Sequence, residues 1–593
     1  MFKHTLGTML AIPLLLLAAC GGATPPPPTV TPPATVLGSA DLSAVPRNRS
    51  LMIGMGLNQD GIGITNPLNP KHGFQDGDIL LWEGLAYYAI FADKEIPWLA
   101  QSMEYTKADY TELTIKLNPL ARWSDGQPVT AQDLLFTFQL QVDNDATGNH
   151  VDFQNFVQAF RAVDDHTVVL TFKVPAPHFK FDVLTFKFDS GLVILPAHAF
   201  SGQADIINFA GALDIVHSGP YRLVYWDADR KIYDLRPDWW AVTAGLIQPP
   251  AVQRVIYADT SAISIDTLAA KIINNEFDTG QDLPTPVIAN ILKNNPKVTT
   301  YSGNAPPYGA LDWFPNSLWL NTQLAPYSDV RVRQALSLAI DRDRLDEAVY
   351  QGAPVATIYP FPLYPGLQKF ADSPEMKALA AQYQPRKFDV AESAQLMTEA
   401  GFAKNTDGLW ARDGLTLDAT IHAFQGIHTD LAPLLAEMLR RAGFDASVDF
   451  SNQSWVPMFS GGPGLYLFGH LGSLVDPYAT LALYHSRHSA PAGTPVAEGF
   501  FSRYSDPAYD QLIDAMPVLP ADDPQFQALA TQAMEIYWRE VIDIPIVQWL
   551  HRIPYNQTYW TNWPTRDNPA MGTDGTYWHT SGLPIIASLK PAQ

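Results

Sequence analysis

The sequence predicts an α/β protein built from a few tightly joined lobes. Two glycines, Gly401 and Gly443, each end an apolar helical pattern and suit the left-handed position that closes a helix. Residues 445–450 then alternate apolar and polar side chains, as a half-buried strand does. Helix, glycine and strand in succession are typical of layered α/β structure. A Pro-rich linker is predicted only near the N-terminus, before residue 48. Because no similar linker follows, the rest of the 593 residues are expected to form joined lobes.

Two strands are predicted in the first third of the chain. Residues 113–117 alternate in polarity, and residues 167–172 are apolar enough for a more deeply buried strand. A turn at Asp125 and Gly126 lies between them. The turn leads into a helix that Thr130 caps, with Asp133 as its capping-box partner.

Three further helices are predicted from apolar residues that recur every three to four positions. The first follows Ser328, which can cap it; its stripe consists of Val332, Ala335, Leu336, Ala339 and Ile340. The second begins at Asp389, with Glu392 as capping-box partner. The third carries Leu431, Leu434, Leu435, Met438, Leu439 and Ala442.

The N-terminus reads as a secretory leader. Lys3 is followed by an apolar run over residues 6–17 and by Leu-Ala-Ala-Cys at residues 17–20. This ending resembles a bacterial lipobox, which implies a lipoprotein signal peptide over residues 1–19 and a diacylglyceryl group on Cys20. An ordinary signal peptide with a chance cysteine is the alternative. Residues 20–47 are expected to form a lipidated N-terminus and a Pro-rich, extended linker.

Composition limits the possible functions. The formal net charge is −22 with no basic cluster, which excludes nucleic-acid binding. The single cysteine leaves no disulfide, thiol nucleophile or thiolate metal site in the mature chain. No run of about 18 apolar residues follows the leader, so no later segment is expected to span a membrane. The 15 Trp, 24 Tyr and 29 Phe suit a pocket that stacks on flat ligand faces.

No catalytic signature is present. The chain lacks an H-E-x-x-H helix, a G-x-S-x-G elbow and a P-loop. His485 and His488 could chelate a metal, but two solvated loop histidines are the favoured interpretation. Asp and Glu are plentiful, so a carboxylate pair for glycoside cleavage stays open.

Six groups of segments, in order along the chain, resemble family 5 of the extracellular solute-binding proteins of ABC importers. This family includes oligopeptide, dipeptide, nickel and some oligosaccharide binders. The six matches are residues 82–85, 97–100, 113–117 and 122–136; 218–223 with 236–240; Asn321 with 329–342; 352–354; 389–402; and 544–547. Most of these residues serve turns and core packing, so they indicate the fold and not the ligand.

The resemblance implies a fold like the type II periplasmic-binding proteins: α/β, with two lobes, an interlobe ligand cleft and an extra domain on lobe 1. Lobe 1 is expected over residues 48–312, with the extra domain at about 76–200. Lobe 2 is expected over residues 313–545, and residues 546–593 return to lobe 1. The chain should cross between lobes near residues 312–316 and 544–548. A monomeric receptor without cofactor, resident metal or catalytic residues is implied, with an ABC permease as partner and an extracytoplasmic location.

One segment bears on the ligand. The family's oligopeptide binders hold the peptide amino terminus with an aspartate in a segment like residues 469–477. Ser473 stands here at the aspartate position and His470 at the tryptophan position, while Asp476 lies three residues further on. Because a buried ammonium group needs a charged partner, Ser473 weakens the prediction of a free α-amino group.

Further ligand-binding candidates come from the positions at which the family lines its cleft: Asn321, Trp82, Trp313, Trp319, Trp455 and Trp549. Stacked indoles with a neighbouring amide suit sugar rings, although each tryptophan could instead be core. Peptide is the default solute of the family that the chain resembles, so an oligopeptide-class solute is predicted, with an oligosaccharide as the alternative because Ser473 replaces the aspartate. A secreted glycoside hydrolase and a nickel or haem scavenger using His485 or His488 are alternatives of other classes.

Overall fold

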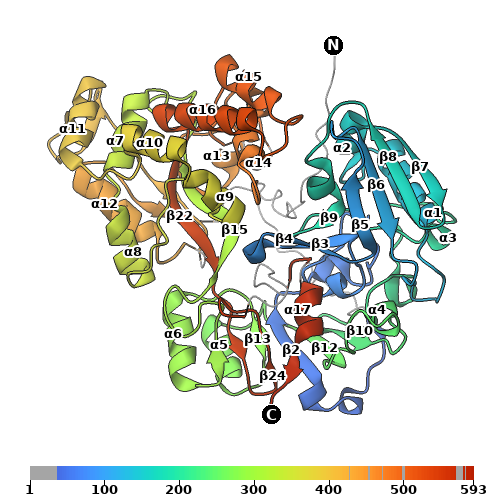
Figure 1. Cartoon of the computed structure of the whole chain (residues 1–593). Coiled ribbons are helices and arrows are strands. Elements are labelled where there is room, and N and C mark those ends of the chain that lie inside the picture. Colours follow the sequence, from blue (N-terminus) through green and yellow to red (C-terminus); the bar gives the residue numbers. More distant parts are fainter. Residues whose placement is uncertain are drawn as a thin grey trace, which may run out of the picture.

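The computed structural model describes residues 36–425, 428–451, 455–469, 472–496, 501–568, 578–580 and 582–593. Three parts pack together (Figure 1): a base at the bottom, an extra domain at the upper right and lobe 2 at the upper left. The base and the extra domain together are called lobe 1. Cys20 and His470 lie outside the described residues, as does the side chain of Trp455. Within the described part of the chain, no helix combines the length and apolar character needed to cross a bilayer.

The base is built on an eight-stranded mixed sheet. Its order is β1 (Leu37–Gly38), β10 (Tyr221–Trp226), β11 (Arg230–Leu235), β12 (Arg254–Asp259), β2 (Ser50–Met55), β13 (Thr279–Gly280), β23 (Tyr555–Asn556) and β14 (Val298–Thr299). The helices of the base are α4 (Trp240–Thr243), α5 (Ile265–Ile273), α6 (Thr285–Asn294) and α17 (Gly582–Ser588). Strand β1 pairs with β10, so the folded body includes residues that the sequence assigns to the linker.

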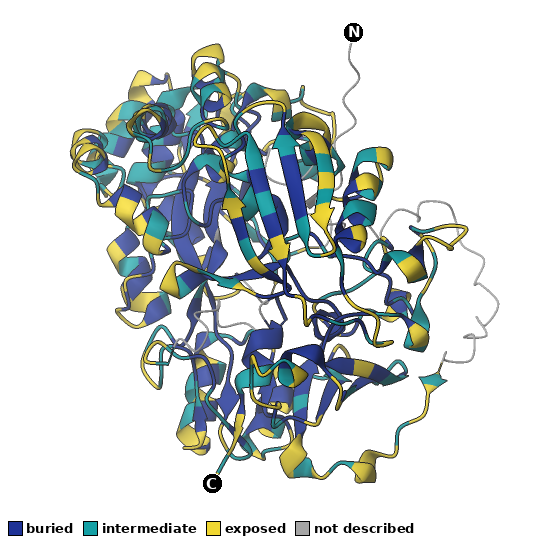
Figure 2. Ribbon diagram, turned by 45° about the vertical axis from the view of Figure 1, so that its right-hand side comes forward, coloured by how far each residue is buried: buried dark blue, intermediate teal, exposed yellow. Residues whose placement is uncertain are grey.

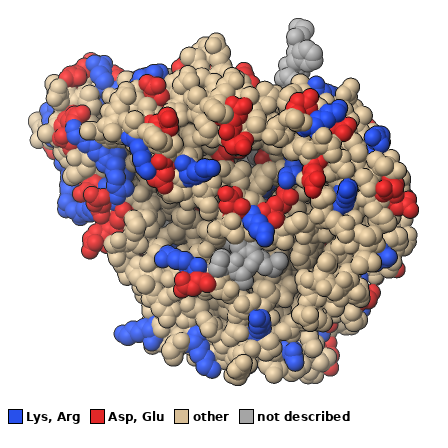
Figure 3. Space-filling view, in the orientation of Figure 1, with Lys and Arg blue, Asp and Glu red and all other residues tan. Residues whose placement is uncertain are grey.

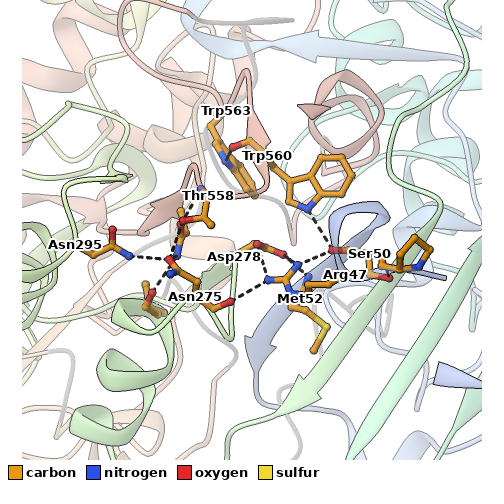
Figure 4. Close-up of polar contacts among 12 residues, drawn as sticks. Arg47, Ser50, Met52, Asn275, Asp278, Asn295, Thr558, Trp560 and Trp563 are labelled. Carbon is orange, nitrogen blue, oxygen red and sulfur yellow. Dashed lines mark hydrogen bonds and ion pairs between the residues drawn. The ribbon is translucent and has the colours of Figure 1, made fainter. Parts of the chain in front are cut away.

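A polar network ties the first described segment to the base (Figure 4). The guanidinium of Arg47 donates to both carboxylate oxygens of Asp278, at 2.8 and 2.9 Å, and to the Ser50 carbonyl at 2.8 Å. Asp278 also accepts the Met52 N–H at 2.8 Å. Burial raises the pKa of Asp278 to about 6, although Arg47 opposes this shift. Trp560 donates to the same Ser50 carbonyl, so segments from both ends of the chain meet here.

The extra domain contains a four-stranded antiparallel sheet in the order β5 (Ala100–Tyr105), β6 (Glu112–Leu117), β8 (Thr167–Phe172) and β7 (Val157–Asp164). Strands β6 and β8 confirm the two predicted strands. Helix α1 (Ala131–Asp143) begins after Thr130, whose N–H donates to Asp133 at 2.8 Å, as the predicted capping box requires. Helix α2 (His150–Phe156) packs against α1. Buried and exposed residues alternate along the strands at the front of Figure 2.

Three separate sequence motifs meet at one buried carboxylate, Glu83. It accepts indole N–H groups from Trp98 at 2.7 Å, Trp240 at 2.8 Å and Trp239 at 3.2 Å. Burial raises the pKa of Glu83 to about 7, although these donors favour the charged form. The motifs that carry the family resemblance therefore serve architecture at this place.

Lobe 2 is built on a five-stranded sheet in the order β20 (Val448–Asp449), β19 (Ile421–His422), β21 (Leu465–Gly469), β15 (Ala310–Trp319) and β22 (Ile544–His551). One hydrophobic cluster packs this sheet with helices α7 (Val330–Leu338), α8 (Arg342–Tyr350), α11 (Val390–Glu399) and α12 (Ala432–Ala442). A second cluster contains residues of α9 (Pro365–Ala371), α10 (Pro374–Tyr383), α14 (Tyr478–Ala482), α15 (Pro507–Ala515) and α16 (Pro524–Glu540).

The remaining short elements, from all parts of the chain, are β3 (Ala86–Ala89), β4 (Lys94–Pro97), β9 (Thr185–Phe186), β16 (Ala403–Lys404), β17 (Trp410–Arg412), β18 (Leu415–Thr416), β24 (Trp560–Thr561), β25 (Lys590–Pro591), α3 (Ala197–Phe200) and α13 (Trp455–Phe459).

The helix predictions in lobe 2 are confirmed in position and corrected in detail. Asp329 caps α7 in place of the predicted Ser328, because its carboxylate accepts the Arg331 N–H at 3.0 Å. Asp389 caps α11 as predicted, but Glu392 pairs with Lys387 and does not complete a capping box. Gly443 closes α12 at a φ of +97°, where a side chain would be strained. The strand predicted over residues 445–450 is limited to β20.

Candidate functional site

Two long strands connect the base with lobe 2. Strand β15 runs antiparallel to β22, with Ala310 opposite His551 and Asn316 opposite Val547. Figure 1 shows β22 running from lobe 2 down to the base. Both predicted crossings lie on these strands, whereas the exact domain boundaries stay a prediction. At the start of β15 the backbones pack closely: a Cβ on Gly309 would lie 2.4 Å from the His551 carbonyl oxygen.

Aromatic rings join lobe 1 to lobe 2 beside the crossing strands. Phe188 stacks on Trp313 with ring centroids 5.0 Å apart and planes 9° apart. Its ring also lies 6.0 Å from Tyr364 and 5.0 Å from His579. Tyr364 in turn contacts Phe91 of lobe 1 at 5.7 Å. Phe91, Phe188, Trp313 and Tyr364 thus form an aromatic contact between the lobes, called the aromatic floor below.

A polar contact joins the extra domain to lobe 2. His178 Nδ1 lies 3.4 Å from an Asp476 carboxylate oxygen, and His178 Nε2 lies 2.8 Å from the Leu519 carbonyl. The ring also stacks with Tyr478 at 6.0 Å. Although burial opposes the charge, the contact with Asp476 and the nearby Asp182 raise the pKa of His178 to about 9. Both ring nitrogens of a lobe 1 residue therefore engage lobe 2.

Two of the predicted tryptophans fill cores. Trp82 is 1% exposed and donates its indole N–H to the Thr65 carbonyl inside lobe 1. Trp319 is fully buried in lobe 2, where it donates to the Phe468 carbonyl at 3.1 Å and stacks with Tyr484. The core interpretation fits both residues, because neither presents its ring at the junction between the lobes.

Two of the predicted polar residues hold turns. Asn321 donates to the Gly461 carbonyl at 2.6 Å and accepts the Gln323 N–H at 2.9 Å. Ser473 exchanges two hydrogen bonds of 2.9 Å with Thr480, one through its hydroxyl and one through its backbone N–H. Both side chains are about 1% exposed. Their hydrogen-bonding capacity is used within lobe 2.

Of the other predicted residues that the structure describes, two contact lobe 1 at the junction. Trp313 forms part of the aromatic floor, and Asp476 forms the contact with His178. Trp549, on β22, packs edge-on against His428 at 6.1 Å and is 9% exposed. The predicted site residues are thus not brought into one cluster. Charged side chains of both signs surround the junction in Figure 3.

His485 and His488, which were considered as a metal-binding pair, contact other side chains of lobe 2. His485 lies between Asp510 at 3.4 Å and Asp514 at 3.2 Å, and its Nδ1 accepts the Arg487 N–H. The His488 Nε2 faces the Arg487 guanidinium at 3.2 Å. The two histidines belong to a local network on lobe 2.

The prediction missed the lobe 1 side of the junction. His178 and Phe188 carry no motif, since their role arises only when the extra domain packs against lobe 2. The one sequence signal at this place is a histidine among prolines and aromatics over residues 175–181. His551 was likewise missed, although it ends the strand that begins at Ile544.

Comparison with known proteins identifies the family. The model of the bacterial extracellular solute-binding proteins, family 5, matches residues 94–491, which is more than half of the chain. The chain belongs to this family. Protein XP55 of Streptomyces lividans is 25% identical over 476 residues, covering 79% of this chain and 78% of the relative. The periplasmic oligopeptide-binding protein OppA of Salmonella typhimurium is 24% identical over 495 residues, covering 79% and 82%.

Solved structures show that the family-5 chain has the two-lobed type II periplasmic-binding-protein fold. A periplasmic oligopeptide-binding protein from Thermotoga maritima superimposes with a TM-score of 0.80 at 22% identity, covering 92% of this chain and 99% of that one. Its mannohexaose-bound structure gives a TM-score of 0.74 at 22% identity, with the same coverage. AppA from Bacillus subtilis, in complex with a nonapeptide, gives 0.65 at 18% identity, covering 88% and 98%. The predicted fold class and family are thereby confirmed, and the family is extracytoplasmic.

Proposed function

We propose that the protein captures an oligopeptide-class solute between its lobes and delivers it to an ABC permease. The proposal rests on the contacts between the two lobes, in a chain that belongs to the family 5 solute-binding proteins. His178 with Asp476 and Phe188 with Trp313 join the lobes at two separate places. Contacts of this kind can form and break as two lobes close on a solute about crossing strands.

An oligosaccharide is the second candidate, and two observations favour it. The hydroxyl of Ser473 already accepts the Thr480 N–H, and it carries no charge to balance a peptide ammonium group. The stacked rings of Phe188 and Trp313 offer the flat apolar surface on which sugar rings pack. The mannohexaose complex of the Thermotoga maritima protein shows that this fold accommodates such a solute.

Calorimetric titration decides between the two solutes. The chain is titrated with a defined pool of tri- to nonapeptides and, separately, with mannohexaose and cello-oligosaccharides. Saturable heat from peptides alone supports the first proposal, and saturable heat from a sugar alone overturns it in favour of the second. Trp313→Ala should weaken binding of either solute. Trp410→Ala, on β17 of lobe 2, is the control: it tests whether loss of any buried indole has the same effect.

We also propose that the protein binds without turnover and is held at the membrane by a lipid on Cys20 as a monomer. A glycoside hydrolase would need a pair of carboxylates free to act on substrate. Incubation of the chain with oligosaccharides overnight, followed by chromatography, should return them uncleaved. Appearance of shorter sugars that depends on a single carboxylate would instead establish an enzyme.

A further inference from the structure

Three buried side chains converge behind the aromatic floor. Asp312 lies on β15, His551 on β22, and His579 precedes α17 near the C-terminus. One ligand atom from each lies within 4.8 Å of the other two, and His551 Nε2 is 3.2 Å from Asp312 Oδ1. The three residues are only 3%, 8% and 3% exposed. No other group of this kind occurs among the residues that the structure describes.

We infer that Asp312, His551 and His579 bind one divalent transition-metal ion of the Zn²⁺ class. Two imidazoles and one carboxylate form a ligand set that Zn²⁺ accepts, with a further position left for water. The site joins both crossing strands to the C-terminal segment. It is independent of the solute proposed above and of His485 and His488.

A second observation supports the site. His551 Nδ1 contacts an Asp282 carboxylate oxygen at 2.7 Å, so that carboxylate can accept the Nδ1 proton. Histidines that bind metals commonly donate their other ring N–H to a carboxylate, which directs the free lone pair toward the ion. His551 Nε2 is buried and points at Asp312 Oδ1, 3.2 Å away. The two carboxylates thus hold the ring in an orientation that suits a metal ligand.

Charge balance also favours a divalent ion. Asp312 is buried and Asp282 is partly exposed, and a protonated His551 between them offsets only one of their two negative charges. A divalent cation with neutral imidazoles offsets both. Imidazole and carboxylate groups bind a metal in their deprotonated forms, so the affinity should fall as the pH is lowered.

The ion would hold the floor of the junction in place. The ring of His579 contacts Phe188 at 5.0 Å, and the Thr580 N–H donates to the Phe188 carbonyl at 2.7 Å. Phe188 in turn stacks on Trp313, which follows Asp312 in the chain. A metal at this position would tie the C-terminal segment, both crossing strands and the stacked pair together.

The test is a titration of the full chain with Zn²⁺ after treatment with EDTA. We expect one ion per chain, bound more weakly at pH 5.5 than at pH 7.5. Asp282→Asn should weaken binding by roughly 10- to 100-fold, as expected for an outer partner. Asp312→Asn and His579→Gln should weaken it further. His485→Gln should leave it unchanged, because that residue lies outside the site.

A measurement on the unsubstituted chain covers the case in which these variants misfold. Trp578 lies 5.1 Å from His551 and 5.9 Å from His579, so a bound Co²⁺ should quench its fluorescence. Trp578→Phe should remove most of the quenching while Co²⁺ still binds. Absence of Zn²⁺ binding overturns the inference, and so does binding that survives in folded Asp312→Asn and His579→Gln variants.

Discussion

Three buried or partly buried ionisable residues are expected to contribute to the pH response of this protein. Glu83, Asp278 and His178 each have a pKa shifted toward or across the neutral range. Glu83 and Asp278 lie in lobe 1, where burial favours their neutral forms. His178 lies between the lobes, where nearby carboxylates favour its charged form. The ionisation of Glu83 and Asp278 should therefore affect the stability of lobe 1, and that of His178 should affect the contact between the lobes.

Arg47 should contribute most to the free energy of unfolding at pH values at which Asp278 is ionised. The pKa of Asp278 is raised to about 6 in the folded chain, so this carboxyl favours folding at low pH and loses that contribution as the pH rises from about 4 to 6. Arg47→Leu removes the partner of the ionised form. We expect a cost of roughly 3 kcal/mol at pH 8 and a much smaller one at pH 5, measured by urea unfolding.

Arg49→Leu is the matched control for this experiment, because Arg49 is an exposed neighbour with no ion pair among the described residues. Equal losses of stability at pH 5 and pH 8 in Arg47→Leu would show that the guanidinium acts through packing, for instance on Tyr559, and not through Asp278.

His178 should make closure of the lobes pH-dependent. Its pKa is about 9 in contact with Asp476 and returns toward 6.5 when the lobes separate. The contact is therefore fully favourable below about pH 6.5 and is lost as the pH rises through 9. The shift corresponds to at most about 3 kcal/mol.

Fluorescence energy transfer between labels on Val163→Cys and Leu415→Cys, in a Cys20→Ser chain, can follow this closure. Both label positions are exposed, one on the extra domain and one on lobe 2. Transfer should decline between pH 7 and 10 in the parent and stay constant in His178→Gln. An unchanged decline in His178→Gln would assign the pH response to another group.

At the scale of elements, local signals made the strands and helix ends predictable. Gly443, Asp389 and the Thr130–Asp133 box act within a few residues of themselves, so their sequence context contains the whole interaction. Ser328 failed as a cap because the adjacent Asp329 competes for the same N–H groups. The extent of β20 was overestimated because alternation alone does not reveal where a pairing strand ends.

The crossing strands offer a test at this scale. A Cβ on Gly309 would lie 2.4 Å from the His551 carbonyl oxygen, so Gly309→Ala must push β15 and β22 apart. We expect a destabilisation of about 1–3 kcal/mol in urea unfolding, together with weaker solute binding. Gly202→Ala is the control, because no atom lies within 4 Å of its added Cβ. Equal behaviour of the two variants would contradict the close packing of these strands.

At the scale of the molecule, the sequence indicated the fold but not the site. The motifs around Glu83 form the interior of lobe 1 and were recognisable in order along the chain. At the junction, His178 meets Asp476 and Phe188 meets Trp313 and His579; the partners of each contact lie far apart in sequence and depend on packing between the lobes. Asn321 and Ser473 appeared to be ligand contacts because a family position does not show whether a neighbour already satisfies the side chain.

We expect the proposed lipid anchor on Cys20 to act independently of solute binding. Cys20 precedes the Pro-rich segment, whereas contacts with the base begin at β1. Cys20→Ser should release the protein from the membrane fraction and leave its solute affinity unchanged, as measured by fractionation and titration. A parallel loss of affinity would show that the N-terminal segment takes part in binding.

Calorimetric titration of the purified chain with peptide and oligosaccharide pools, combined with analysis of the recovered solutes, tests the central proposal most directly. The account predicts saturable binding of one solute class at one site per chain, weakened by Trp313→Ala, with every solute recovered intact. No binding by any pool, or conversion of a solute into smaller products, would contradict it.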